Sequence, residues 1–160
     1  KNGGGVTFSG GEPLAQRAFL SDVIDACKSQ DINCAIETSL IYYDKAILQK
    51  LDLVMADLKI WDDTLHRQYT GVSNTEIKEN FQRLDALGAP VIARTPVIPG
   101  IRQGIEQIAA FLKKLKHVAR YELLPYHPLG ESKRQALGLE RTGFQQPSKE
   151  YMKRLEAFTF

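Results

Sequence analysis

The stretch 51-LDLVMADLKI-60 decides the fold, because it has the pattern of a strand with two different faces. Successive side chains of a strand point to opposite sides. One side would carry the apolar set Val54, Ala56, Leu58 and Ile60. The other side carries Met55 and then Asp57 and Lys59 near the end of the strand. The first face is therefore suited to pack against helices, whereas the second ends in a carboxylate and an ammonium group.

Strands and helices are expected to alternate along the whole chain. The other strands are expected at Gly5–Ser9, Asn33–Thr38, Pro90–Ile98 and Arg120–Pro125. Helical spacing of apolar residues predicts helices at Ala15–Ser29, Asp44–Lys50, Asn74–Leu87, Ile105–Leu115 and Ser148–Phe158, and a loop between Pro125 and Ser148. Ser73 and Glu76 have the spacing of a capping box, and Gly88 is expected to end its helix. Repeated alternation predicts parallel βαβ units with right-handed crossovers, in one domain over residues 1–160.

Charged residues recur where these strands end. Glu37 ends the second strand, while Arg94 and Glu122 interrupt the apolar runs of the fourth and fifth. A buried charge is costly unless it is paired or binds something. Charges from several strands, gathered near their carboxyl ends, favour a polar lumen, which is where barrel enzymes keep their sites. We therefore expect the α/β fold of a partial β/α (TIM-like) barrel and not an open doubly wound sheet.

The composition indicates an ordinary globular protein. The 160 residues carry a net charge of +2, with no Lys/Arg run, which argues against a nucleic-acid or membrane partner. Cys27 and Cys34 fit no zinc or cluster spacing and imply no disulfide scaffold, so a reducing cytoplasm is expected.

Three motifs could carry chemistry, and each has a simpler explanation. Gly10-Gly11-Glu12-Pro13 allows close approach of a ligand to the backbone, or it is a plain strand-to-helix turn. Asp57 and Lys59 hold polar groups of a ligand, or they form an internal ion pair. His127, fixed between Pro125 and Pro128, contacts a ligand or is a surface residue.

These motifs together resemble one family. GGEP after a strand, IETS, DLVMADLK, YTGVSN, TPVIPG and LLPYHPLG occur in the order typical of radical S-adenosylmethionine enzymes that activate glycyl-radical enzymes, most closely the pyruvate formate-lyase-activating type. The resemblance runs from Gly5 to about Leu139. It implies a [4Fe–4S] cluster and S-adenosylmethionine, whose cleavage gives a 5′-deoxyadenosyl radical that removes a hydrogen from a glycine of the partner enzyme.

The resemblance also implies roles for particular residues. Gly10, Gly11 and Glu12 resemble the segment that holds the methionyl amine of S-adenosylmethionine. Asp57, Leu58 and Lys59 are similar to residues that line the same pocket. Arg94 resembles the basic residue near the methionyl carboxylate, and His127 the residue that reaches the adenosyl portion. Some activases hold a monovalent cation, which here would lie at Glu37, Thr38, Met55 and Asp57; Glu37 stands where an Asp is common, and a Lys59–carboxylate ion pair is the alternative.

The chain departs from the family in lacking the C-x₃-C-x₂-C loop that binds the cluster, which Cys27 and Cys34 cannot replace. We interpret it as a fragment, strands two to six of a six-stranded barrel, with the cluster ligands upstream. No catalytic residue is assigned to it, and alone it is predicted to be inactive. The implied partners of the complete enzyme are a glycyl-radical enzyme of the pyruvate formate-lyase type and an electron donor such as flavodoxin or ferredoxin.

Two other functions fit the residues. A β/α-barrel aldolase or isomerase would use Lys59 to form a Schiff base with a carbonyl substrate. A non-catalytic binding domain would keep the fold without the chemistry.

Overall fold

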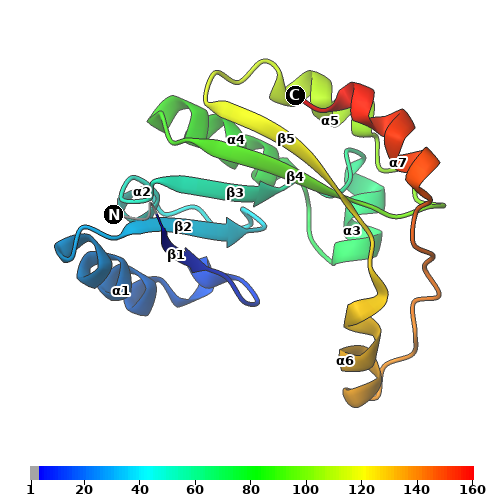
Figure 1. The fold of residues 1–160 in the computed structure, drawn as a ribbon, viewed down its shortest axis with the longest axis horizontal. Coiled ribbons are helices and arrows are strands. Elements are labelled where there is room, and N and C mark those ends of the chain that lie inside the picture. Colours follow the sequence, from blue (N-terminus) through cyan, green and yellow to red (C-terminus); the bar gives the residue numbers. More distant parts are fainter. Residues whose placement is uncertain (1–3) are drawn as a thin grey trace.

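The structure, a computed structural model, describes residues 4–160 and has one parallel five-stranded sheet (Figure 1). The strands are β1 (Gly5–Phe8), β2 (Asn33–Thr38), β3 (Leu53–Asp57), β4 (Val91–Val97) and β5 (Val118–Pro125). Their order in the sheet is their order in the sequence, and every neighbouring pair is parallel. An order without reversal is that of a barrel segment, because a doubly wound sheet reverses direction at a switch point.

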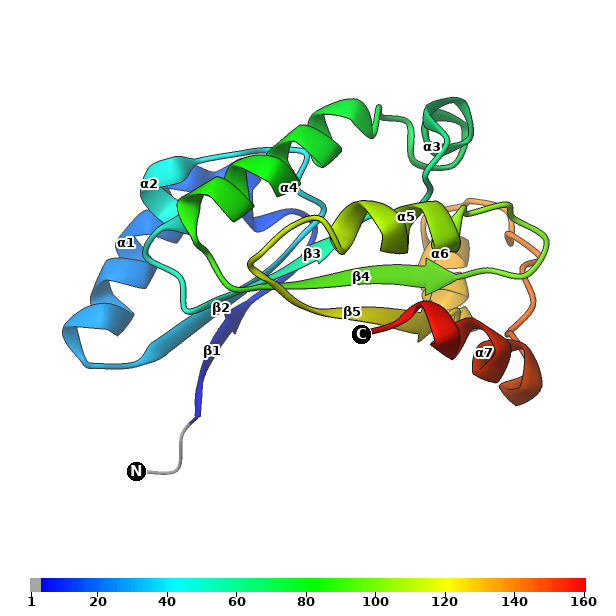
Figure 2. The same ribbon diagram turned by 90° about the horizontal axis from the view of Figure 1, so that it is seen from above.

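The helices that connect the strands cover one face of this sheet. They are the short 3₁₀ helix η1 (Pro13–Gln16) with α1 (Arg17–Ser29), α2 (Lys45–Leu48), α3 (Asp63–Thr70) with α4 (Thr75–Leu87), and α5 (Ile105–Leu112). In Figure 2 α1, α2, α4 and α5 lie on the same side of the strands. After β5 come η2 (Pro128–Gly130), α6 (Glu131–Ala136), α7 (Lys149–Leu155) and η3 (Glu156–Phe158). Helices on one face and sequential strands confirm the expected TIM-like partial barrel.

The two faces of β3 are those that its sequence predicts. Val54, Ala56 and Leu58 are completely buried and belong to the core, with Phe81 of α4 and Ile108 of α5. The alternate residues of β3 are half-buried on the opposite face. The apolar face thus holds the helices in place, and the charged face is left for other contacts.

The pairing of β4 with β5 contains a bulge. Val91 lies opposite Val118, but Ile92 lies opposite Arg120, so Ala119 is an extra residue in β5. Beyond this point Tyr121 is opposite Ala93 and buried on the core side, while Glu122 is opposite Arg94. A bulge of this kind bends the strand and increases its twist, as a closing barrel requires.

Several sequence predictions need correction at the local level. The capping box is wrong: Asn74, not Ser73, is the N-cap of α4, and the Ser73 hydroxyl donates to Asp63 Oδ1 at 2.6 Å and accepts from the Thr75 N–H at 3.2 Å. β3 ends at Asp57, three residues early, and α5 ends before Leu115. The helices α3 and α6 were not predicted; α6 lies in the expected loop. The left-handed Gly88 that ends α4 is confirmed, and Asp44 caps α2 by accepting from the Ile47 N–H.

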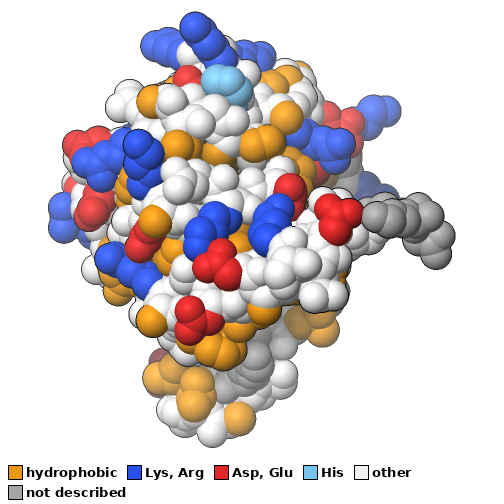
Figure 3. All heavy atoms as spheres, turned by 90° about the vertical axis from the view of Figure 1, so that its left-hand side faces the viewer, with side chains coloured by type: hydrophobic (Ala, Val, Ile, Leu, Met, Phe, Trp, Pro, Cys, Tyr) orange, Lys and Arg blue, Asp and Glu red, His pale blue; other side chains and the backbone are white. Residues whose placement is uncertain are grey.

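Charged side chains of both signs are interspersed among apolar ones on the face that Figure 3 shows. Within residues 4–160, no helix is both long and apolar enough to cross a membrane.

Gly104, which precedes α5, supports the first testable prediction. Its φ is +70°, and a Cβ there would lie 2.7 Å from Cβ of Trp61. Gly71 has a similar φ of +79°, but a Cβ there would meet nothing within 4 Å. Left-handed strain costs roughly 1–2 kcal/mol at either position, and overpacking adds about 1–3 kcal/mol at Gly104 alone. Gly104→Ala should therefore lower the free energy of unfolding, measured by urea denaturation, clearly more than Gly71→Ala. Equal losses would contradict the close packing of Gly104 on Trp61.

Candidate functional site

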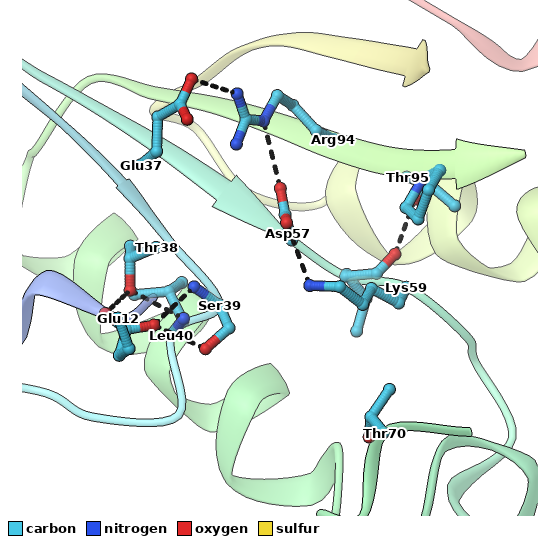
Figure 4. A network of polar contacts seen from close by, with 12 residues as sticks. Glu12, Glu37, Thr38, Ser39, Leu40, Asp57, Lys59, Thr70, Arg94 and Thr95 are labelled. Carbon is cyan, nitrogen blue, oxygen red and sulfur yellow. Dashed lines mark hydrogen bonds and ion pairs between the residues drawn. The ribbon is translucent and has the colours of Figure 1, made fainter. Parts of the chain in front are cut away.

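A row of alternating charges lies at the carboxyl edge of the sheet (Figure 4). From β4, Arg94 donates through Nη1 to Glu37 Oε1 at 2.8 Å and through Nε to Asp57 Oδ1 at 3.1 Å. The second oxygen of Asp57 accepts from Lys59 Nζ at 3.0 Å. The row therefore runs Glu37, Arg94, Asp57, Lys59, with two negative and two positive groups.

Arg94 is the most enclosed member of this row. Its side chain is 13% exposed, against 22% for Asp57 and 38% for Glu37. Burial by itself would lower the pKa of Arg94, but the hydrogen bonds and charges of Glu37 and Asp57 outweigh it and raise that pKa. The guanidinium thus stays charged and holds residues of three neighbouring strands together.

Glu12 forms a second polar cluster at the end of β1. Its Oε1 accepts from Thr38 Oγ1 at 2.7 Å and from the Leu14 N–H at 3.2 Å. Its Oε2 accepts from the N–H and hydroxyl of Ser39, at 2.8 and 2.6 Å. Glu12 therefore caps η1, as the simpler explanation of this motif expects, and also ties β1 to the end of β2.

The two glycines before Glu12 leave their surroundings open. Gly10 has a φ of +136°, a conformation that side-chain-bearing residues rarely adopt. A Cβ on either Gly10 or Gly11 would meet nothing within 4 Å. The backbone here is accessible to a ligand.

The remaining predicted site residues lie apart from these clusters. The Leu58 side chain is fully buried on the helix-facing side, and its carbonyl accepts from Thr95 Oγ1 at 2.6 Å. His127 is exposed at the start of η2, after β5, and makes no contact with the charged row among the described residues. The structure thus brings together Glu37, Asp57, Lys59 and Arg94, and leaves His127 outside that network.

The predicted cation site involves groups that already have partners. Glu37 and Asp57 share Arg94, and the Thr38 hydroxyl donates to Glu12. Arg94 supplies the positive charge that two neighbouring carboxylates require. Over residues 4–160, no group of three His, Cys, Asp or Glu side chains is placed to hold a metal ion. The monovalent-cation site remains a prediction.

The thiols of this chain do not fit a [4Fe–4S] cluster. Cys34 is buried in β2, and burial, with Cys27 close by, raises the pKa of its thiol. A cluster needs several closely placed thiolates. Its ligands are therefore not among these two residues.

A cavity of about 280 Å³ beside the charged row was not predicted. It is lined by Ser39, Ile41, Asp57, Lys59, His66, Thr70, Val72 and Ile77. His66 of α3 is 2% exposed, and its Nδ1 lies 2.8 Å from the Val72 carbonyl. Burial lowers the pKa of His66, and the charges of Lys59 and Lys78 lower it further, so the ring is neutral near pH 7. The signal in the sequence is His66 four residues before Thr70, which places both on one side of a helical turn.

Comparisons with known proteins agree with this arrangement. Residues 1–115 match the Radical SAM superfamily. The chain is 41% identical to the isethionate sulfite-lyase activating enzyme of Nitratidesulfovibrio vulgaris, over 98% of this chain and 53% of that protein. It is 35% identical to the pyruvate formate-lyase-activating enzyme of Clostridium pasteurianum, over 99% of this chain and 69% of that protein.

Solved structures show the same relationship. A domain of pyruvate-formate lyase-activating enzyme from Bacteroides vulgatus superposes with a TM-score of 0.78 at 31% identity, covering 98% of this chain and 92% of that one. Coproporphyrinogen III oxidase from Escherichia coli, 14% identical with a TM-score of 0.63, shares the fold.

The sequential parallel sheet with a charged carboxyl edge is thus that of a radical SAM protein. Within this superfamily, the chain belongs to the family of glycyl-radical-enzyme activases. It spans about half the length of the first of these relatives and about two thirds of the second.

Glu12 generates the second prediction. Glu12→Gln replaces a carboxylate oxygen with an NH₂ group that must face donors, so charge-assisted bonds are lost. We expect the free energy of unfolding to fall by about 2 kcal/mol. Glu79→Gln is the matched control, because Glu79 is 55% exposed and contacts Arg83 at 3.8 Å; its effect should stay within about 0.5 kcal/mol. If urea denaturation shows the two variants to be alike, Glu12 does not tie β1 to β2.

Proposed function

We propose that this chain forms the S-adenosylmethionine-binding part of an enzyme that activates a glycyl-radical enzyme. The observation that carries the proposal is the row of four paired charges beside the open backbone of Gly10 and Gly11, in a chain of the activase family. A methionyl group is a zwitterion, and a row of alternating charges suits a ligand with one amine and one carboxylate.

The residues of this chain would bind and orient the cofactor. The exposed backbone at Gly10–Glu12 would approach the methionyl amine, and Arg94 with Lys59 would face the carboxylate. Asp57 and Glu37 keep Arg94 in place, and Leu58 contributes through its backbone. His127 would reach the adenosyl portion. When bound, a [4Fe–4S] cluster supplies the electron that cleaves S-adenosylmethionine, and its ligands would come from residues beyond this chain.

The partner of the complete enzyme is a glycyl-radical enzyme. The pyruvate formate-lyase type and isethionate sulfite-lyase are equal candidates, because relatives named for each enzyme match nearly the whole chain. A flavodoxin or ferredoxin in the cytoplasm would deliver the electron.

The structure offers less support to the alternative chemistry of Lys59. Its amino group donates to Asp57 at 3.0 Å, so the group that a Schiff base needs is already engaged in an ion pair. Borohydride trapping with a carbonyl substrate would reveal such an enzyme. A non-catalytic domain would fail the cleavage assay below in every form.

The third prediction separates this chain from the complete enzyme. After anaerobic reconstitution with iron and sulfide, residues 1–160 alone should produce no 5′-deoxyadenosine with any reductant, because the thiolate triad is absent from the sequence. A full-length protein that contains this chain and a C-x₃-C-x₂-C segment should cleave S-adenosylmethionine under the same conditions. Cluster-dependent cleavage by residues 1–160, or none by the full-length protein, would contradict the proposal.

The fourth prediction tests the glycines as a ligand cradle. A Cβ at Gly11 would meet no atom within 4 Å, so Gly11→Val should leave folding intact. It should nevertheless weaken binding of S-adenosylmethionine to the full-length protein about tenfold or more, because it occupies space that the ligand needs. Gly4→Val is the control, since it is equally open but lies at the opposite end of β1. Equal affinities of both variants in a calorimetric titration would mean that the glycines only make a turn.

A further inference from the structure

The cavity beside Lys59 contains a hydrogen-bond acceptor that the protein leaves free. The His66 Nδ1 lies 2.8 Å from the Val72 carbonyl, which can only accept, so the hydrogen of the neutral ring is on Nδ1. The other ring nitrogen, Nε2, is then an acceptor, and among the described residues nothing donates to it. His66 is one of the residues that line the cavity and is only 2% exposed, so a group that enters the cavity is the partner available to this acceptor.

The other polar groups of the cavity are donors and acceptors in fixed places. Lys59 uses one of its three N–H donors on Asp57 and keeps the others. Ser39 donates its hydroxyl hydrogen to Glu12 and retains an acceptor oxygen. The Thr70 hydroxyl donates to the His66 carbonyl at 2.7 Å, which fixes the turn that presents the ring. Apolar side chains complete the wall: Ile41, Val72 and Ile77.

These groups select the chemistry of an occupant. A cation would meet the ammonium group of Lys59 in the cavity wall, and the one carboxylate there, Asp57, already has both oxygens engaged by Lys59 and Arg94. An ionised carboxylate has no hydrogen to donate, so the buried His66 acceptor would remain unsatisfied. A hydroxyl or a primary amide can donate to His66 and accept from Lys59 at once. The cavity thus suits a small neutral group of this kind.

The size and position of the cavity indicate that the group that occupies it belongs to a polypeptide. Its volume of about 280 Å³ corresponds to about nine water-sized groups at about 30 Å³ each, which is the size of one amino-acid residue and too small for S-adenosylmethionine. It lies at the Lys59 end of the charged row, on the α3 side, where Figure 4 shows Thr70, whereas Arg94 and Glu37 form the other end.

We propose that this cavity is a subsite for one residue of the polypeptide target, a residue whose hydroxyl or primary amide donates a hydrogen bond to His66 Nε2. The inference rests on the proposed function, because it assumes that the second substrate is a protein. His66 is then a binding residue that helps to select the target.

Two substitutions of His66 separate this role from its structural one. In His66→Asn the amide N–H takes the place of Nδ1–H and preserves the bond to Val72, but no acceptor remains at the position of Nε2. In His66→Gln the amide reaches the position of Nε2. Ile41→Phe narrows the same cavity without changing any hydrogen bond of His66, and it keeps the proposal testable if a His66 variant is unstable.

The fifth prediction concerns these variants in the full-length protein with its cluster reconstituted. Pyruvate formate-lyase and isethionate sulfite-lyase serve as probes, and the glycyl radical is measured by electron paramagnetic resonance. His66→Asn should raise the KM for the activated probe roughly three- to tenfold, the loss of about one hydrogen bond. Ile41→Phe should raise it as well, because the narrower cavity no longer accepts the target residue. His66→Gln should stay within about twofold of the wild type. Formation of 5′-deoxyadenosine without a probe, and affinity for S-adenosylmethionine, should not change.

Each other result overturns the subsite. An unchanged KM in His66→Asn and Ile41→Phe means that no target residue enters the cavity. A parallel loss of affinity for S-adenosylmethionine means that the cofactor occupies it. If the wild type cleaves S-adenosylmethionine and makes a glycyl radical, such results contradict the subsite alone; if it does neither with either probe, the proposed function fails and the subsite with it. The ring nitrogen signals of ¹⁵N-histidine give an independent readout, because binding of the activated probe should shift Nε2 of His66.

Discussion

The carboxyl edge of this sheet depends on the guanidinium of Arg94. It is largely removed from solvent and has a carboxylate on either side, Glu37 from β2 and Asp57 from β3. A buried charge without a partner is strongly destabilising, so Arg94 and Asp57 require one another, and the more exposed Glu37 gives the guanidinium a second partner. Lys59 completes the row by engaging the second oxygen of Asp57. The arrangement exists because parallel strands bring their carboxyl ends to one edge, where side chains far apart in the sequence become neighbours.

Glu12 connects the end of β1 to its neighbouring strand, as Arg94 connects the ends of β2, β3 and β4. Its carboxylate collects the hydroxyls of Thr38 and Ser39 and two backbone N–H groups, so the turn after β1 is held against the end of β2. Polar contacts thus connect the carboxyl ends of the four neighbouring strands β1, β2, β3 and β4. The apolar face of the same strands packs against helices. The helical side supplies the stability of the fold, and the opposite side is left to position charges for a ligand.

The sequence predicted the architecture and the charged row, but not the cavity. Period-two alternation in Leu51–Ile60 is a strong signal, and the strand faces follow from it directly. The eight-residue helix α3 has only Leu65 and Tyr69 as large apolar residues, so periodicity could not detect it; it is delimited by the Asp62 cap at its start and the left-handed Gly71 at its end. His66 was missed for the same reason. The Ser73–Glu76 capping box does not form, because Asp63, on an undetected helix, binds the Ser73 hydroxyl and the Asn74 N–H, and α4 begins one residue later than the spacing predicts. Such contacts depend on tertiary neighbours and not on local spacing.

The bulge at Ala119 determines which face of the sheet each later side chain of β5 lies on. Every residue of β5 after Ala119 faces the side that the extra residue assigns to it, with Tyr121 toward the core and Glu122 beside Arg94. Removing a single residue within the strand would exchange these sides, burying a carboxylate and exposing an aromatic ring. Changes of length are therefore tolerated in the turn that precedes β5, but within the strand they must come in pairs. The single extra residue Ala119 thus determines which side chains of β5 face the core and which face the opposite side.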